Sequence, residues 1–287
     1  MREIGGHVSA AGGIELAIER AAAIGGNCVQ VFSGSPRVWA RSELTKFDPV
    51  KIDAKRKEKG IGSIITHALY LVNLASDNPE LIAKSMKAIA YDLEFDARIH
   101  GNGVVVHVGS HKGAGWEPVR ELVKDCIAKL VAAAPEGSTF LIENAAGQNG
   151  KIGGNLEEIA WMISEIGSPK LGWCFDTCHS FAAGYGLGKS QPEGAVLPRT
   201  AAAEIERLGL WSTLKCVHVN DSRDPFGSGR DRHDNLGDGI IPKGDLEHFL
   251  NLPQLAKIPL ILEVPGKEKE GPDAENIARL KKLAHVA

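Results

Sequence analysis

Short apolar runs that end in His, Asp or Glu recur six times along this chain of 287 residues. Each run has the length and the β-branched or aromatic content of a buried strand, and turn residues and a helical pattern follow it. One strand, one loop, one helix and a return loop fill the distance between successive runs, so we predict successive βα units. The runs are Ile64–His67, Val104–His107, Phe140–Glu143, Trp173–Asp176, Cys216–His218 and Leu260–Glu263.

Patterns of helical period lie between these runs, and Asp48, Asn78 and Asn155 are suitable cap residues. Adding strands near Ile4–His7 and Asn27–Phe32 gives eight strands and eight helices. We therefore predict the α/β class, a (β/α)8 TIM barrel formed as a single domain over residues 1–287. The expected helices are Ile14–Ile24, about Pro49–Lys59, Pro79–His100, Glu117–Ala134, Leu156–Ile166, Ala201–Leu208, Leu246–Leu250 and Ala274–His285.

Side-chain alternation along the strands predicts that the terminal polar residues point inward at the rim of the barrel. Counting back by two from each of them gives a small or apolar residue suited to the barrel interior. These interior residues are Ile65, Val105, Leu141, Cys174, Cys216 and Ile261. The C-terminal ends of the strands meet at one mouth, and the His, Asp and Glu residues gathered there are good ligands for a transition metal, zinc above all.

Composition narrows the function classes. The chain is 43% hydrophobic and 24% charged, with a formal net charge of −3, which argues against a general nucleic-acid binder because phosphates are bound largely by Lys and Arg. Bound zinc ions would make the net charge positive, and the added positive charge would lie at the mouth of the barrel. Four long connections fall on the rim side, over residues 33–47, 109–116, 145–154 and 220–244. They carry Arg37, Arg41, Lys112, Arg223, Arg230 and Arg232.

The chain shows no sign of membrane insertion or of a disulfide framework. No run approaches the length of a membrane span, and the first residues lack an apolar leader region. Five cysteines is an odd number, and Cys28, Cys174 and Cys216 lie inside apolar runs, which suits reduced thiols. We therefore expect a cytoplasmic protein.

Two short motifs add candidate ligands. We expect a turn after Asp176 that lets Asp176 and His179 reach one ion or two neighbouring ions. An isolated motif of this kind is more often a helix cap beside a surface histidine, but the rim position favours a metal site. In an extended backbone Asp231 and His233 point to the same side, and Arg232 points away toward solvent or phosphate. With His179 they would give three ligands and leave a position open, as catalytic zinc requires.

Glu143 and Glu263 end apolar strands, where an unpaired carboxylate is costly. Each needs a metal cation, an Arg or Lys partner, or a proton. The alternative is a purely structural network of Arg and Glu side chains. No strand end carries an Arg or Lys that could pair with these carboxylates, whereas histidines are abundant there. His7, at the end of the first strand, is expected to support the site through hydrogen bonds rather than to bind metal.

Several segments together resemble the endonuclease IV type of apurinic/apyrimidinic endonuclease, AP endonuclease family 2. The resemblance runs from about His7 to Gly266, and the Asp-Thr-Cys-His and His-x-Asn-Asp-Ser-Arg segments carry it most strongly. The matching segments are Phe175–His179 with Ala182–Tyr185, His218–Arg223 with Gly227-Ser228 and Asp231–His233, His107 with Gly109–His111, Glu143-Asn144 with Ala146–Gln148, and Leu262-Glu263 with Pro265-Gly266.

That resemblance implies a TIM barrel that holds three zinc ions, with Mn²⁺ as an alternative at one or more sites. By position, the ligands of one zinc are His67, His107 and Glu143. Glu143 also bridges to a second zinc, whose other ligands are Asp176, His218 and Glu263. The ligands of the third zinc are His179, Asp231 and His233.

The implied activity is hydrolysis of the phosphodiester bond 5′ to an abasic site in double-stranded DNA, with 3′-repair diesterase activity as well. The products are a 3′-hydroxyl and a 5′-deoxyribose phosphate. We expect a monomer whose catalytic carboxylates are Glu143 and Glu263, one of which orients the nucleophile. The resemblance places Arg37, Tyr70 and Leu71 against the DNA, and the rim loops add Arg223, Arg230 and Arg232.

The chain departs from the usual family pattern at a few positions, none of them an inferred ligand. Val108, Ala145 and Val264 replace residues that are common beside the ligands, and Asn149–Lys151 alters the loop after Gln148. Two other functions stay open on the sequence. A sugar isomerase or epimerase would use a similar metal-binding rim, and a non-catalytic protein could bind damaged DNA without cutting it.

Overall fold

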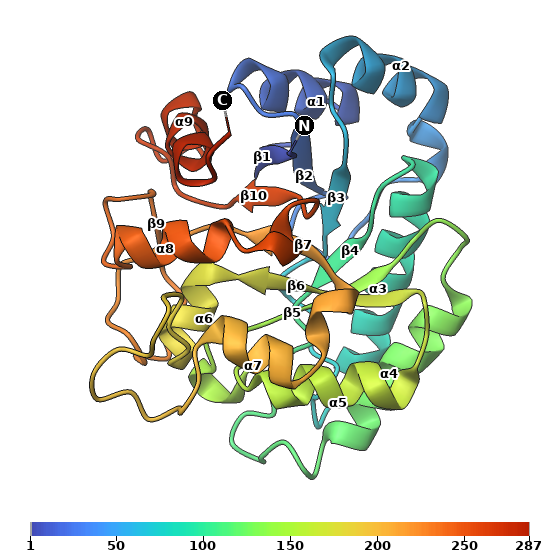
Figure 1. Cartoon of the computed structure of the whole chain (residues 1–287). Coiled ribbons are helices and arrows are strands. Elements are labelled where there is room, and N and C mark those ends of the chain that lie inside the picture. The colour runs from blue at the N-terminus through green and yellow to red at the C-terminus, as the bar shows by residue number, and fades with distance from the viewer. Residues whose placement is uncertain (1, 287) are drawn as a thin grey trace.

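The computed structural model describes residues 2–286, and its centre is a closed barrel of eight parallel strands surrounded by helices (Figure 1). Each strand pairs with the one before it in the barrel, and the first strand closes on the last. The predicted TIM barrel is confirmed. The strands are β1 (Ile4–His7), β2 (Cys28–Phe32), β3 (Ile64–His67), β4 (Val104–Val106), β5 (Phe140–Glu143), β6 (Leu171–Asp176), β7 (Leu214–His218) and β10 (Leu260–Leu262).

Within residues 2–286, the helices between the strands follow the sequence prediction closely. They are α1 (Ile14–Ala23), α2 (Pro49–Lys59), α3 (Pro79–Arg98), α4 (Arg120–Ala133), α5 (Leu156–Ile166), α6 (Thr177–Ala183), α7 (Ala201–Arg207), α8 (Lys243–Leu250) and α9 (Ala274–Leu283). Short 3-10 turns are η1 (Leu44–Lys46), η2 (Gln148–Gly150), η3 (Leu210–Thr213) and η4 (Pro253–Leu255). None of these described helices combines the length and apolarity needed to cross a membrane.

Local chemistry explains most helix starts. The side chains of Asp48 and Asn78 accept hydrogen bonds from the first free N–H groups of α2 and α3, and a proline occupies the first turn of each helix. Helix α4 begins at Arg120 rather than at Glu117, and α8 begins at Lys243 rather than at Leu246. Both differences fall at helix ends, where apolar periodicity is least informative.

The structure corrects one prediction at the mouth and adds a hairpin to another segment. Helix α6 begins directly after β6, where a turn was expected, because the Asp176 carboxylate accepts the backbone N–H of His179 at 2.8 Å and caps the helix. The long connection after β7 contains a short antiparallel hairpin of β8 (Asp221–Ser222) and β9 (His233–Asp234). The hairpin returns this connection toward the barrel.

The barrel interior contains the apolar layer that side-chain alternation predicted, with one addition. Cys28 joins the expected residues, and every member of the layer is at most 1% exposed. The backbones of β1 and β2 approach closely here, since a Cβ on Gly5 would lie 1.9 Å from the carbonyl oxygen of Cys28. Outside the barrel, Trp173 is fully buried and its Nε1 donates to the Leu210 carbonyl oxygen at 2.9 Å. The helices therefore pack against a barrel whose core is filled.

Candidate metal centre

Glu143 lies at the centre of the mouth, fully buried and surrounded by imidazoles. Its Oε2 lies 3.3 Å from His67 Nε2 and 3.1 Å from His107 Nε2. Its Oε1 lies 3.0 Å from His218 Nδ1 and 3.4 Å from His179 Nδ1. Within residues 2–286, neither Glu143 nor Glu263 pairs with an Arg or Lys. The alternative to a metal site, a network of Arg and Glu side chains, therefore does not describe this rim.

Three groups of potential ligand atoms share this space, with the atoms of each group within 4.8 Å of one another. Two groups coincide with ligand sets that the resemblance implied. In the third, Asp176 stands where the resemblance implied Asp231. Asp231 is nevertheless close, since its Oδ1 lies 3.0 Å from His179 Nε2 and 3.4 Å from His233 Nε2. The groups are His67, His107 and Glu143; Glu143, Asp176, His218 and Glu263; and Asp176, His179 and His233.

The electrostatics of the mouth suit a cation. Burial lowers the pKa of His107 to about 4, so this ring stays neutral and offers a lone pair. Burial opposes charge on His179 as well, but the carboxylates of Asp176 and Asp231 outweigh it and raise the pKa of His179 to about 10. Carboxylates that attract a proton this strongly also attract a metal ion. The Glu143 Oε2 atom is buried without a hydrogen-bond partner, so a metal ion would satisfy it.

Gln30, which the sequence analysis did not single out, orients two of the candidate ligands. Its Oε1 accepts from His218 Nε2 at 2.8 Å, which leaves Nδ1 of that ring facing the carboxylates. Its Nε2 donates to Glu263 Oε1 at 2.6 Å, and His7 Nδ1 donates to the same oxygen at 2.9 Å. His7 therefore lies in the hydrogen-bonding position expected for it. The signal for Gln30 was a polar residue at an inward position of the apolar run Cys28–Phe32.

Two of the candidate DNA-contacting residues, Tyr70 and Leu71, line cavities beside this cluster. Arg37 is exposed, Tyr70 is 56% exposed and Leu71 is 36% exposed. Tyr70 forms part of the wall of two cavities. One cavity, of about 770 Å³, reaches His233 and Glu263, and the other, of about 580 Å³, reaches His107 and Asp231.

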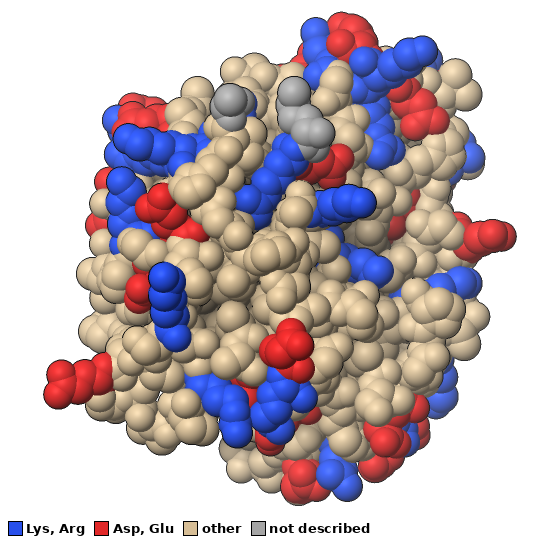
Figure 2. Space-filling view, viewed as in Figure 1, with Lys and Arg blue, Asp and Glu red and all other residues tan. Residues whose placement is uncertain are grey.

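The arginines of the rim loops pair with acids rather than standing free. Arg232 projects toward solvent, with its side chain 57% exposed, and its guanidinium also makes a two-point contact with the Asp224 carboxylate. Arg230 also lies 3.5 Å from Asp224, and Arg223 lies 3.5 Å from Asp234. Their side chains remain about half exposed. On the face shown in Figure 2, basic and acidic residues are likewise interspersed.

The loop after Gln148 brings one basic side chain, that of Lys151, into the mouth of the barrel. Lys151 Nζ lies 3.2 Å from Asp231 Oδ2, so this carboxylate faces His179 with one oxygen and an ammonium group with the other. Arg41, by contrast, folds back onto its own loop, where it donates to the carbonyl oxygen of Val38 at 2.7 Å.

A closed parallel barrel with His, Asp and Glu clustered at its C-terminal mouth defines a metal-binding TIM barrel. The family model described as "Xylose isomerase-like TIM barrel" matches residues 18–283. Curated relatives named "Probable endonuclease 4" include one from Chloroflexus aurantiacus, 35% identical over 289 residues and covering 100% of both chains. Another, from Methanoculleus marisnigri, is 37% identical over 286 residues and covers 98% of each chain.

Solved structures agree with these relatives. The crystal structure of endonuclease IV from Thermus thermophilus matches with a TM-score of 0.82 at 33% identity, over 99% of each chain. The chain belongs to the endonuclease IV family and is an enzyme of the deoxyribonuclease IV type. A D-tagatose 3-epimerase-like protein also matches, with a TM-score of 0.71 at 18% identity over 99% of this chain and 97% of that one. This second likeness shows a shared fold alone.

Proposed function

We propose that this enzyme is a zinc-dependent DNA-repair endonuclease that hydrolyses the phosphodiester bond 5′ to abasic sites in duplex DNA. The products are a 3′-hydroxyl and a 5′-deoxyribose phosphate, and the same site also trims blocked 3′ ends. The observation that carries the proposal is the position of Glu143, whose carboxylate belongs to two adjoining groups of potential metal ligands. The full-length relatives named endonuclease 4 support the reaction class.

The residues present fit zinc well. Imidazole nitrogens and carboxylate oxygens are ordinary zinc ligands, and Mn²⁺ is an alternative where oxygen predominates. We assign three ions to the three groups, with Asp231 joining His179 and His233 in the third. When bound, such ions supply Lewis-acid charge at the phosphoryl oxygens and activate water near neutral pH.

The protein's own residues orient the reacting groups. The imidazoles around Glu143 hold its pKa well below the ordinary value despite burial, so this carboxylate is ionised and available as a bridge. Glu263 is fixed by His7 and Gln30, so one of its oxygens is restrained while the other lies 3.2 Å from His218 Nδ1. Glu143 and Glu263 are therefore the carboxylates we assign to orienting the nucleophile.

Recognition of the lesion follows from the exposed residues around the mouth. An abasic nucleotide lacks base stacking, so turning it out of the duplex is less costly than for a normal nucleotide. The exposed Tyr70 and Leu71 side chains can occupy the gap that it leaves, and Arg37 can contact the backbone. Additional phosphate contacts are assigned to Arg223, Arg230 and Arg232, each of which must share its charge with an acid.

The proposal extends to the cellular location and the oligomeric state of the enzyme. The five cysteines are free and buried, which fits the reducing cytoplasm. We propose that the enzyme acts there as a monomer, with a TIM barrel that supplies the whole ligand set from one chain.

The direct test is incision of a duplex that contains one tetrahydrofuran abasic analogue. Protein purified with its metals should cut on the 5′ side and leave an end that a DNA polymerase extends. Glu143→Gln should keep the fold and lose about a thousandfold or more in incision, because metal charge supplies several kcal/mol of transition-state stabilisation. Glu121→Gln, an exposed change on α4, is the matched control. Absence of cutting by the wild type after zinc is restored would refute the function, and near-normal Glu143→Gln would reject the bridge.

A further inference from the structure

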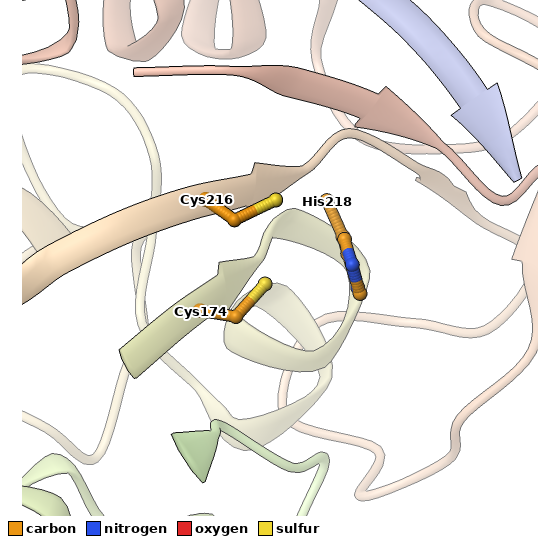
Figure 3. A group of neighbouring side chains, drawn as sticks. All are labelled: Cys174, Cys216 and His218. Carbon is orange, nitrogen blue, oxygen red and sulfur yellow. The ribbon is translucent and has the colours of Figure 1, made fainter. Parts of the chain in front are cut away.

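Two thiols and an imidazole converge immediately beneath the candidate metal centre. Cys174 and Cys216 are both fully buried, and their sulfur atoms and a ring nitrogen of His218 lie within 4.8 Å of one another. Figure 3 shows both Sγ atoms directed toward the side on which His218 lies. The proposed nuclease reaction uses neither thiol.

The register of two neighbouring strands produces this cluster. Strand β6 pairs Cys174 with Cys216 of β7, and it pairs Asp176 with His218 two residues further on. Because side chains alternate, both pairs point into the barrel, one layer above the other. The sulfur atoms therefore form the floor of the mouth, and His218 belongs to the floor as well as to the rim.

His218 can serve only one ion at a time. Its Nε2 donates to Gln30 Oε1, so Nδ1 is the ring nitrogen available to a metal ion, which would displace any proton held there. That atom lies 3.0 Å from Glu143 Oε1 and 3.2 Å from Glu263 Oε2, on the oxygen-rich side. A metal that prefers oxygen and nitrogen is held above, whereas one that prefers sulfur is drawn below.

We propose that Cys174, Cys216 and His218 form a binding site for a soft, thiophilic divalent cation such as Cd²⁺, and that occupation of this site withdraws His218 from Glu143 and Glu263. A tetrahedral zinc ion, with bonds of about 2.3 Å to sulfur, would place two sulfur atoms about 3.8 Å apart, and the larger Cd²⁺ ion places them further apart, so the cluster must contract by less than about 1 Å. Binding displaces the protons of the two thiols, which leave to solvent, and the two thiolates then balance the charge of the divalent ion in an otherwise apolar layer.

The experiment titrates the full-length protein, purified with its metals, with Cd²⁺ and follows the ultraviolet thiolate-to-cadmium charge-transfer absorption. Oxygen and nitrogen ligands give no such band, so exchange at the upper groups is silent. The band should saturate at one equivalent per chain. It should fall at least tenfold in Cys174→Ala and in Cys216→Val, and it should persist in Cys28→Ala, which alters a thiol in the same layer outside the cluster. X-ray absorption should count two sulfur ligands.

A missing band in the wild type, or one that survives in both cluster variants, would overturn the site. The effect on His218 rests on the proposed nuclease function and has its own readout. One equivalent of Cd²⁺ should slow incision of the abasic duplex at least tenfold more in the wild type than in Cys216→Val. Equal slowing would overturn the withdrawal of His218. A wild type that shows the band but never cuts DNA would instead refute the nuclease function and leave the cadmium site standing.

Discussion

Replacing Asp96 by Asn should remove one well-defined contribution to the pH dependence of this protein's stability. Asp96 lies in α3 and is fully buried against the outside of the barrel, hydrogen-bonded to the hydroxyls of Thr66 at 2.9 Å and Ser138 at 3.1 Å. Burial raises the pKa of Asp96 to about 7 from an ordinary value of 3.8, and the hydroxyl groups offset only part of this effect. The folded chain therefore keeps a proton that the unfolded chain loses.

The size of the effect follows from these two pKa values. They differ by about three pH units, and each unit corresponds to about 1.4 kcal/mol. Below about pH 4 the carboxyl is protonated in both states. Between about pH 4 and 7 the unfolded state binds fewer protons than the folded state, so the free energy of unfolding falls as pH rises, by about 4 kcal/mol in total. Above about pH 7 the contribution of Asp96 to the free energy of unfolding no longer changes with pH. In Asp96→Asn this pH-dependent contribution is absent, because Asn does not titrate.

Urea unfolding followed by circular dichroism, at a series of pH values from about 4 to about 8, measures this contribution. A chelator in every sample keeps metal binding out of the comparison. The stability of Asp96→Asn relative to the wild type should rise by about 4 kcal/mol across the series. Asp125→Asn, which alters a carboxylate on α4 that is 61% exposed, should show no comparable rise. A difference between Asp96→Asn and the wild type that stays constant with pH would refute the reasoning.

Three further outcomes are expected. Gln30→Leu should weaken metal retention about 10- to 100-fold, measured as metal content after dialysis against graded chelator, because His218 and Glu263 lose their shared partner; unchanged retention would contradict the orienting role. Trp173→Phe should lower the free energy of unfolding by about 2 to 3 kcal/mol, since it opens a void and removes one of the two side-chain donors to the Leu210 carbonyl, the other being the Thr213 hydroxyl; an unchanged urea midpoint would argue against it. Arg37→Ala should weaken duplex binding and reduce the slope of log affinity against log salt by about 1, whereas an unaltered slope would remove Arg37 from the phosphate contacts.

Much of the fold was predictable because buried strands have a simple sequence pattern. A parallel strand buried on both faces is a continuous apolar run, and its end is marked where a polar residue meets the rim. Counting back by two from these ends found the interior layer, including Cys174 and Cys216. The candidate ligands could be gathered from the sequence for the same reason, since strand ends in a closed barrel converge wherever they lie along the chain.

Other features depend on contacts that no local pattern records. Helix α6 is short, so its periodicity is weak, and the sequence left open whether Asp176 caps a helix or binds a metal ion. The pairing of Arg232 with Asp224 bridges two arms of one loop. The orienting role of Gln30 requires neighbours from β7 and from just beyond β10. Long-range hydrogen bonds of this kind follow from the register of the barrel, which the sequence alone leaves undetermined.

The closure of β1 on β10 determines when the metal centre can form. His7 and Glu263 meet across that seam, at a separation of 256 positions along the chain. A polypeptide emerging from the ribosome holds most of the imidazoles long before it holds Glu263. Two of the three groups of potential ligands are complete before Glu263 is made, so only the group that contains Glu263 must wait for the end of synthesis and the closure of the barrel.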